Sequence, residues 1–292
     1  MVVNVLVLFA VAILWTFTFI FLKIEERTIP PITIMAGRAL IAFFLLLSVA
    51  LITKKDLLGH LRDWWKFFVF AFLGITLAWV GLAKGQEGVS VGVAAVLDAV
   101  IPISTFILLV LVLRQVPFTL AGFFGLVLGA GGIVLVVGVH KLISAEATVV
   151  GVVTLVAAYF IFAVNSILVE KWTKKIDPLI TSTYFLFFAS IMLWGLAFIF
   201  EKPEHLPWTG DNYIEELVLG IFCTGVGYYL YYLLVHRAGA YFSCFIFYLI
   251  PVMGMIAGIL ILHEDFNLLR FLGVPIVQAG VYLVNREKFK KG

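Results

Sequence analysis

Apolar runs that are long enough to cross a lipid bilayer follow one another along almost the whole sequence. A helix rises about 1.5 Å per residue, so a hydrocarbon core of about 30 Å requires about 20 apolar residues. The runs that meet this length are 2–22, 31–53, 66–84, 88–113, 119–140, 148–170, 178–200, 213–235, 240–262 and 267–285. Short polar or proline-containing joints separate them. The sequence therefore predicts an all-α integral membrane protein with ten transmembrane helices.

The composition excludes the main soluble classes. Hydrophobic residues make up 63% of the 292 positions and charged residues 13%, against about 25% charged residues in typical soluble chains. A net charge of +3 is too small to indicate a nucleic-acid partner. The two cysteines show no metal or redox spacing, and no catalytic or phosphate-binding motif is present. We expect no enzymatic activity, no cofactor and no metal site.

The distribution of lysine and arginine indicates how the chain is oriented. The first apolar run lacks a basic leading segment and a small-residue cleavage site, so we interpret it as a retained helix. The joints on the side of the N-terminus carry more than twice as many lysines and arginines as the opposite joints. Positive joints stay in the cytoplasm. We expect a multi-pass protein of the inner (plasma) membrane with both termini cytoplasmic.

The two halves of the chain repeat one pattern. An ungapped offset of 149 places Pro102 on Pro251 and Trp79 on Tyr228. We interpret 1–143 and 144–292 as two repeats of five helices. Because five is odd, the second repeat enters the membrane from the opposite side. Such inverted repeats are typical of alternating-access carriers, whose binding site lies near the midplane between the halves.

Two charged residues lie inside predicted spans. Asp98 is about ten residues into the run 88–113, so it lies ~15 Å deep, where an aspartate costs about 2.5–3.5 kcal/mol. We expect Asp98 to anchor a substrate amine or to carry a coupling proton; a structural pair is the alternative. Arg38 could bind a substrate carboxylate, pair with Asp98, or extend its long stem to the membrane surface.

Aromatic residues within the spans are candidates for the wall of a cavity. The aromatic residues within the spans are Trp15, Trp79, Tyr159, Tyr228, Tyr229, Tyr231, Tyr232 and Tyr248. We expect Trp15, Trp79, Tyr228, Tyr232 and Tyr248 to contact the substrate. An aromatic wall suits an apolar or cationic substrate, whereas aromatics at helix ends mark the membrane interface. Tyr228 and Tyr232 share one helix face because they are four residues apart, and the repeat predicts that Trp79 and Tyr228 lie on opposed sides of one cavity.

Three further residues within the spans are candidates for binding or motion. Asn165 could contact a ligand, although an interhelical hydrogen bond is the usual role of such a residue. Pro102 and Pro251 each remove a backbone hydrogen bond and kink a helix. We expect them to act as hinges, with static bending as the alternative.

Several short motifs occur in the order and spacing of a known family. They are Trp15-Thr-Phe-Thr-Phe19, Pro31 followed by Arg38, the prolines Pro102 and Pro251, and a small-apolar run from Gly258 that ends in His263-Glu264. In this the chain resembles the drug/metabolite transporter superfamily, specifically the ten-helix EamA-like exporters, over essentially its whole length. The resemblance implies a carrier of small metabolites with a central cavity, often an amino-acid or drug exporter. Arg114-Gln115 departs from the Gly-Glu usual in that turn, and Asp98 replaces an apolar or small residue.

These observations favour a secondary active transporter of an amino acid or a related zwitterion or amine, working by alternating access and, from the resemblance, exporting its substrate. The partners we expect are the small-molecule substrate and the lipid bilayer. Proton or substrate exchange and a homodimer are left open. One alternative is uptake or antiport of a nucleotide-linked cofactor, although its phosphates would need more cations than Arg38. Another is a non-transporting membrane scaffold or lipid-handling protein.

Overall fold

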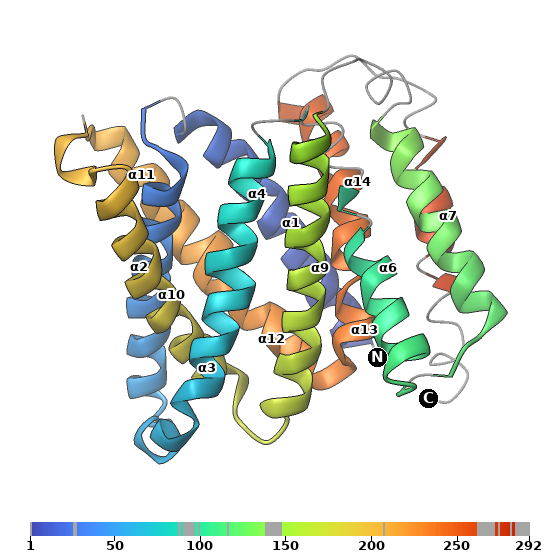
Figure 1. Ribbon diagram of the computed structural model, residues 1–292, viewed down its shortest axis with the longest axis horizontal. Helices are drawn as coiled ribbons and strands as arrows, with labels where there is room; N and C mark the ends of the chain where they lie inside the picture. Colours follow the sequence, from blue (N-terminus) through green and yellow to red (C-terminus); the bar gives the residue numbers. More distant parts are fainter. Residues whose placement is uncertain are drawn as a thin grey trace. The chain divides into compact units, whose positions relative to one another are not determined.

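The computed structural model shows an all-helical chain (Figure 1). It describes residues 2–25, 28–86, 89, 97–98, 100–115, 117–137, 148–206, 208–261, 272–273, 275–280 and 282–283. No strand occurs among these residues, so the predicted all-α class is confirmed. The turn residues His263 and Glu264 and the basic residues 286–291, which contributed to the predicted family and orientation, lie outside the described ranges.

Apolar helices account for nine of the ten predicted runs. Within the described part of the chain, five helices are long and apolar enough to cross a membrane: Pro31–Ile52, Leu58–Leu82, Val149–Trp172, Pro178–Phe200 and Gly210–Ala238. Shorter apolar helices cover Val2–Thr18, Val100–Val112, Leu120–Leu135 and Ala240–Gly254. The second of the long helices begins at Leu58, eight residues before the predicted run 66–84, because a 3-10 turn leads into it. In the tenth predicted run the described residues 272–273, 275–280 and 282–283 are helical.

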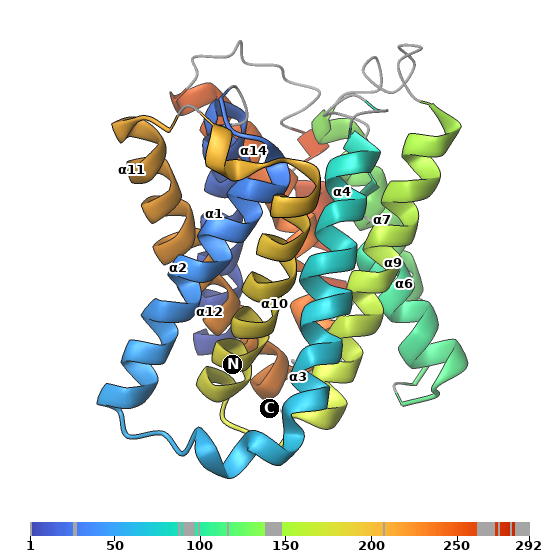
Figure 2. The same cartoon turned by 60° about the vertical axis from the view of Figure 1, so that its left-hand side comes forward.

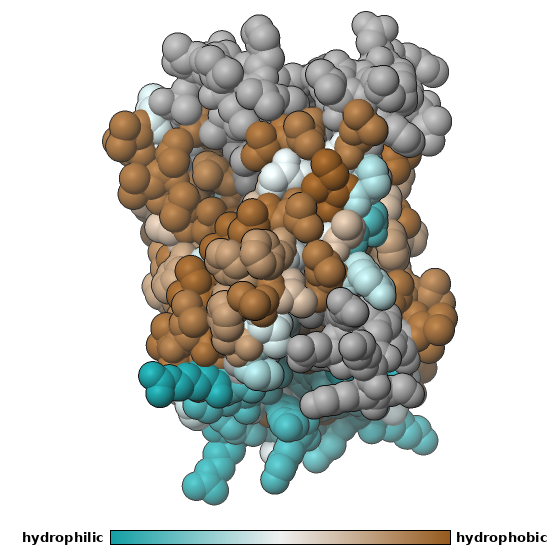
Figure 3. All heavy atoms as spheres, turned by 90° about the vertical axis from the view of Figure 1, so that its right-hand side faces the viewer, coloured by the Kyte–Doolittle hydropathy of each residue, from teal (hydrophilic) through white to brown (hydrophobic). Residues whose placement is uncertain are grey.

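Large hydrophobic side chains point outward along these helices. Leu120, Phe124 and Val127 of one helix and Val149 and Val153 of another are more than half exposed. Figure 3 shows hydrophobic residues over most of the coloured surface on one face. Apolar patches of this extent mark a membrane-facing surface rather than one in contact with water.

The chain forms two compact units, and each unit takes segments from both predicted repeats. Unit 1 consists of Met1–Ile13, Gly81–Val164 and Ala238–Gly292, and unit 2 consists of Leu14–Val80 and Asn165–Arg237. The unit boundaries fall inside four helices, which are α1 (Val2–Glu25), α4 (Ala78–Gln86), α9 (Val149–Trp172) and α12 (Gly227–Ala238). The compact units and the repeats 1–143 and 144–292 therefore divide the chain in different ways.

The remaining elements belong to one unit each. Unit 1 contains α6 (Val100–Phe106), the π-helical segment η3 (Ile107–Val112), α7 (Leu120–Val137), α13 (Ala240–Ser243) and α14 (Ile246–Ile261). Unit 2 contains α2 (Pro31–Ile52), η1 (Leu58–Asp63), α3 (Trp64–Ala71), η2 (Phe72–Leu77), α10 (Pro178–Phe200), η4 (Pro203–His205), α11 (Gly210–Val218) and η5 (Leu219–Val226).

In unit 2, α2 and α10 pack side by side and are tied together at both ends (Figure 2). Both helices begin with a proline, Pro31 or Pro178, at the first turn, where a missing N–H costs nothing. Glu201, just after α10, accepts the N–H groups of Ile32 and Thr33 at 3.0 and 2.7 Å. A carboxylate there is stabilised by the positive end of the helix dipole. The two helices therefore run antiparallel.

The other end of the pair is held by Asp177. Its side chain caps α10 by accepting the Leu179 N–H at 2.8 Å, and it forms an ion pair with Lys55, which follows α2. Burial opposes ionisation of Asp177, but hydrogen bonds from Lys55 and the Leu179 N–H outweigh this effect and lower the pKa of the carboxyl below its usual value. Hydrogen bonding to Asp177 in turn raises the pKa of Lys55.

Two π-helical segments of unit 2 occupy equivalent places in the two halves. The segment η2 ends at Leu77 and η5 ends at Val226, positions that are again separated by 149 residues. In each case one small residue follows, and then Trp79 or Tyr228. Such π turns change the register of a helix and are frequent at functional sites.

Candidate functional site

Unit 2 encloses a cluster of aromatic rings centred on Tyr228. The Tyr228 ring lies 5.4 Å from that of Trp15 and 6.0 Å from that of Trp79, measured between centroids. All three side chains are buried, with exposed fractions of 8% or less. The residues that the repeat made equivalent, Trp79 and Tyr228, thus lie next to each other. The separations suit edge-to-face and tilted ring pairs.

The local backbone explains how Trp15 reaches this cluster. Gly227 follows the π turn directly, and a Cβ atom at this position would lie 2.8 Å from the Trp15 indole nitrogen. Glycine therefore leaves the space in which the indole packs. The Trp15 ring also contacts Tyr231 at 5.1 Å, whose hydroxyl is hydrogen-bonded to Ser166 at 2.6 Å.

Arg38 enters the cluster from α2. Its Nε donates a hydrogen bond to the Thr224 hydroxyl at 2.8 Å, and its guanidinium carbon lies 4.2 Å from the centre of the Trp79 ring. This is a cation–π contact, which is strongest where water is excluded. The side chain is only 4% exposed, so it does not extend to the membrane surface. Of the roles that the sequence left open for Arg38, this geometry is compatible with binding a charged group inside the protein and not with reaching the membrane surface.

The contact between Arg38 and Trp79 has an uncharged counterpart in the other half. Arg38 lies seven residues after Pro31, and Phe185 lies seven residues after Pro178. The Phe185 ring packs on Tyr228 at 5.2 Å, just as Arg38 packs on Trp79. The two halves therefore present the same contact, but only the first half supplies a positive charge.

Asn165 borders the same cluster. A Cβ atom at Gly74 in η2 would lie 2.2 Å from the Asn165 amide nitrogen, so the amide packs where position 74 has no side chain. Asn165 also approaches the Tyr232 hydroxyl. Neither that hydroxyl nor the Asn165 Oδ1 has a well-formed hydrogen bond among the described residues. Buried polar atoms of this kind are commonly satisfied by a water molecule or a ligand.

Asp98 lies in unit 1, where it is 5% exposed. Its carboxylate is hydrogen-bonded to the hydroxyl of Tyr159 on α9, and its backbone carbonyl accepts the Ile101 N–H at 3.1 Å as α6 begins. The sequence placed Tyr159 only among the aromatic residues within the spans, without a role at Asp98. Its one signal is a tyrosine in the middle of an apolar span, and that signal does not identify the partner.

Tyr248 lies in unit 1 and connects two helices there. Its hydroxyl donates to the Leu126 carbonyl of α7 at 3.2 Å, and its ring fills the space beside Gly129, where a Cβ would be 2.2 Å away. Pro251 follows in the same helix, α14. Pro102 lies in α6, which continues into the π-helical η3. Unit 1 thus contains both prolines that we expect to act as hinges.

Sequence reasoning missed a buried carboxylate, Glu216 of α11. It is 3% exposed, and its carboxylate packs against α2, where a Cβ at Gly37 would lie 2.6 Å from Oε1. The signal was the pair Glu215-Glu216 near the start of the run 213–235. Acidic residues at that position usually face water at the end of a span, so the pair did not indicate a buried group.

Comparisons with known proteins agree with this architecture. Relatives named uncharacterised transporters include YoaV of Bacillus subtilis, which is 23% identical over 97% of both chains, and a protein of Archaeoglobus fulgidus, which is 26% identical over 94% of this chain and 95% of its own. Protein PagO of Salmonella typhimurium is 23% identical over 87% of this chain and 83% of its own. A solved crystal structure shares the fold, with a TM-score of 0.80 over 97% of this chain and 96% of its own at 16% identity.

The sequence pattern of the EamA-like transporter family matches residues 3–138 and again residues 149–286. The two matches together span most of the chain, and they bear out the resemblance found from the short motifs. The chain therefore belongs to the EamA-like transporter family.

Proposed function

We propose that this protein is a secondary active transporter that moves an amino acid, or a related zwitterion or amine, by alternating access and out of the cell. The observation that carries the proposal is the buried Arg38 held against Trp79 inside an aromatic cluster. The relatives that are named transporters support transport as the activity, and outward direction rests on the resemblance to EamA-like exporters.

Arg38 is the group that recognises the substrate carboxylate. A guanidinium presents its N–H groups in a planar fork that matches the two oxygens of a carboxylate. Thr224 and Trp79 hold this fork in one orientation, from its edge and from its face. The rings of Trp15, Tyr228 and their neighbours contact the apolar part of the substrate. A single positive charge suits a monocarboxylate better than a substrate that carries several phosphates.

Asp98 carries the coupling proton. A carboxylate buried in a membrane span is costly when charged, so its protonation and conformational change are energetically linked. The Tyr159 hydroxyl can hydrogen-bond to either form of the carboxyl, donating to the anion or accepting from the acid. In this scheme a proton on Asp98 is exchanged for the substrate across the inner membrane, with both termini of the protein in the cytoplasm.

The test is transport into proteoliposomes, using radiolabelled amino acids and the corresponding amines, with and without a pH gradient. We expect flux of at least one amino acid. A proton gradient that drives protons in the import direction should accelerate substrate flux in the export direction. The Asp98→Asn variant should retain substrate exchange between labelled and unlabelled pools and lose the response to the gradient. Tyr159→Phe serves as the milder companion variant.

Other results would overturn the proposal in distinguishable ways. Flux of a nucleotide-linked cofactor and of no amino acid would replace the substrate class. An unaltered gradient response in Asp98→Asn would remove Asp98 from coupling. No flux of any compound in a well-folded, correctly inserted sample would favour a scaffold or lipid-handling protein.

A further inference from the structure

Two buried polar side chains of unit 2 lie close together without completing a hydrogen bond. Asn165 of α9 is 2% exposed and Tyr232 of α12 is fully buried, and the Asn165 amide approaches the Tyr232 hydroxyl. The Asn165 Oδ1 and the Tyr232 hydroxyl have no well-formed hydrogen bond among the described residues. A buried polar atom without a partner costs about 1–3 kcal/mol, so this pair requires a physical explanation.

The neighbouring residues of the same two helices form a completed pair. The hydroxyls of Ser166 and Tyr231 are hydrogen-bonded at 2.6 Å. The two helices are therefore close enough at this level for their side chains to bond directly. The open pair Asn165–Tyr232 does not result from helices that are held too far apart, and its polar atoms are available to a third group.

Close packing fixes both side chains of the open pair. A Cβ atom at Gly74 would lie 2.2 Å from the Asn165 amide nitrogen, so Asn165 occupies the space that this glycine leaves. The Tyr232 ring packs edge-on against Phe185 at 5.1 Å and against Tyr228 at 6.0 Å. Groups that are fixed before a ligand arrives lose little entropy when the ligand binds.

The open pair is too far from Arg38 to bind the same functional group of a substrate. Arg38 is held at Thr224, and Tyr232 follows Thr224 by eight residues in the helix Gly210–Ala238. This spacing corresponds to about 10–12 Å along the helix axis. The amine and the carboxylate of an amino acid are attached to one carbon atom, so a substrate held by Arg38 would meet the open pair with its side chain.

The donor and acceptor groups of the open pair define what that side chain carries. An amide oxygen only accepts hydrogen bonds, whereas a tyrosine hydroxyl donates or accepts. A hydroxyl or a primary amide can donate to the Asn165 Oδ1 and accept from the Tyr232 hydroxyl at the same time. An apolar side chain would leave both buried atoms without partners.

We propose that Asn165 and Tyr232 form a specificity subsite that selects substrates with a hydroxyl or an amide on the side chain. Ring contacts lead from Arg38 over Trp79 and Tyr228 to Tyr232, and these rings contact the apolar stem between the two polar ends of the substrate. This inference rests on the proposed transport of an amino acid and names the side-chain chemistry of that substrate.

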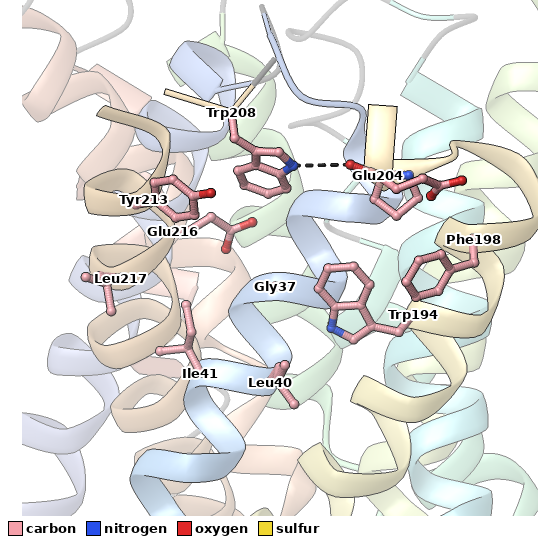
Figure 4. Close-up of a pocket in the computed structure, with 11 residues that line it drawn as sticks. Gly37, Leu40, Ile41, Trp194, Phe198, Glu204, Trp208, Tyr213, Glu216 and Leu217 are labelled. Carbon is pink, nitrogen blue, oxygen red and sulfur yellow. Dashed lines mark hydrogen bonds between the residues drawn. The ribbon is translucent and has the colours of Figure 1, made fainter. Parts of the chain in front are cut away.

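A pocket elsewhere in unit 2 supplies a control. It has a volume of about 530 Å³ and lies between α2, α10 and α11 (Figure 4). Neither Asn165 nor Tyr232 belongs to its lining. Tyr213 lines this pocket and is 57% exposed. Tyr213→Phe therefore removes a tyrosine hydroxyl from unit 2 at a position outside the subsite.

Two pairs of amino acids of matched shape test the subsite. L-Homoserine carries a hydroxyl where L-norvaline carries a methyl group, and δ-hydroxy-L-norvaline differs from L-norleucine in the same way. Binding to the full-length protein in detergent is measured from the rise of the thermal unfolding midpoint with ligand concentration. We expect the hydroxyl-bearing member of at least one pair to bind about tenfold or more tightly, because a site built for a hydrogen bond rejects an analogue that cannot form it.

Three variants test the two residues. Tyr232→Phe and Asn165→Leu should each abolish the preference for the hydroxyl, whereas Tyr213→Phe should preserve it. Equal binding within both pairs by the unmodified protein would refute the subsite and leave amino-acid transport in place. Binding of none of the four compounds would also overturn the subsite, and amino-acid flux in proteoliposomes then decides whether the proposed function falls with it.

The stability of the protein without ligand separates a binding role from a structural one. Ser166→Ala breaks the completed bond to Tyr231 and should lower the unfolding midpoint. Tyr232→Phe removes a hydroxyl that has no well-formed bond and should leave the midpoint unchanged or raise it. A loss in Tyr232→Phe as large as that in Ser166→Ala would show that this hydroxyl is bonded within the protein or to a fixed water molecule, and would overturn the proposal.

Discussion

The sharpest prediction concerns Arg38, because its partners allow a structural role and a binding role to be separated. In Arg38→Gln the charge disappears, and the residue no longer donates from Nε to Thr224 or packs a cation on Trp79. If Arg38 also binds the substrate carboxylate, the variant loses a charge-assisted hydrogen bond worth about 1.5–3 kcal/mol. That corresponds to an affinity lower by about 10- to 150-fold.

The assay compares an amino acid with the amine that lacks its carboxylate. Competition of each compound against flux of a labelled substrate gives two apparent affinities for each variant. We expect Arg38→Gln to weaken the amino acid strongly and the amine little. Arg38→Lys should be intermediate for the amino acid, because lysine keeps the charge but lacks the planar fork and its stacking on Trp79.

Phe185→Leu is the matched control, since Phe185 makes the equivalent, uncharged contact on Tyr228. It should affect the two compounds equally through packing alone. Thermal unfolding in detergent must show that each variant remains folded. If Arg38→Gln weakened the amino acid and the amine by the same factor, the reasoning would be wrong, and Arg38 would be a purely structural residue.

Three further predictions address packing, charge and coupling. Gly74→Ala should lower the free energy of unfolding by about 1–3 kcal/mol, because the new Cβ meets the Asn165 amide. Adding Asn165→Ala should restore part of the lost stability. Strictly additive losses of the two variants in thermal denaturation would contradict the contact. Asp177 has a lowered pKa, so the stability it contributes is fully present above the unfolded pKa of 3.8 and is lost as the pH falls through the folded pKa. Asp177→Asn, which also removes the ion-pair partner of Lys55, should lower the stability at pH 7 and flatten the fall in stability below pH 3.8. An unchanged dependence of stability on pH would contradict this role of Asp177. Tyr159→Phe should shift the pH dependence of transport while leaving the apparent affinity for the amine unchanged, whereas a change in affinity alone would place Tyr159 at the substrate.

Features that depend on local sequence were predictable. Apolar length is a property of consecutive residues, and nine of the predicted runs coincide with apolar helices among the described residues. The offset of 149 also made Trp79 and Tyr228 equivalent, but the sequence placed them on opposed sides of one cavity, whereas their rings are neighbours at 6.0 Å. Equivalent residues of an inverted repeat meet when they lie close to its pseudo-symmetry axis.

Features that depend on distant contacts were not predictable. The partner of Arg38, Thr224, is 186 residues away, and nothing in either neighbourhood marks the pair. The burial of Glu216 follows from the missing side chain at Gly37 of another helix. The π turns before Ala78 and Gly227 leave no pattern in composition, since a π turn and an α turn use the same apolar residues. The pairing of Tyr159 with Asp98 likewise required the two helices to be brought together.

Unit 2 is built from two segments that are far apart in the sequence, Leu14–Val80 and Asn165–Arg237, and this has a consequence for how the protein is made. The first turn of α2 obtains its cap from Glu201, which lies 168 residues later than Thr33, and α10, against which α2 packs, is also made late. At a synthesis rate of about 5–20 residues per second, α2 waits in the membrane for roughly 10–30 s before these partners leave the ribosome. During that interval Arg38 has neither Thr224 nor the completed cluster around it. Until then, insertion factors and quality-control proteases meet a protein whose first half lacks its partners. We therefore expect damage to unit 2 to appear first as premature degradation during synthesis.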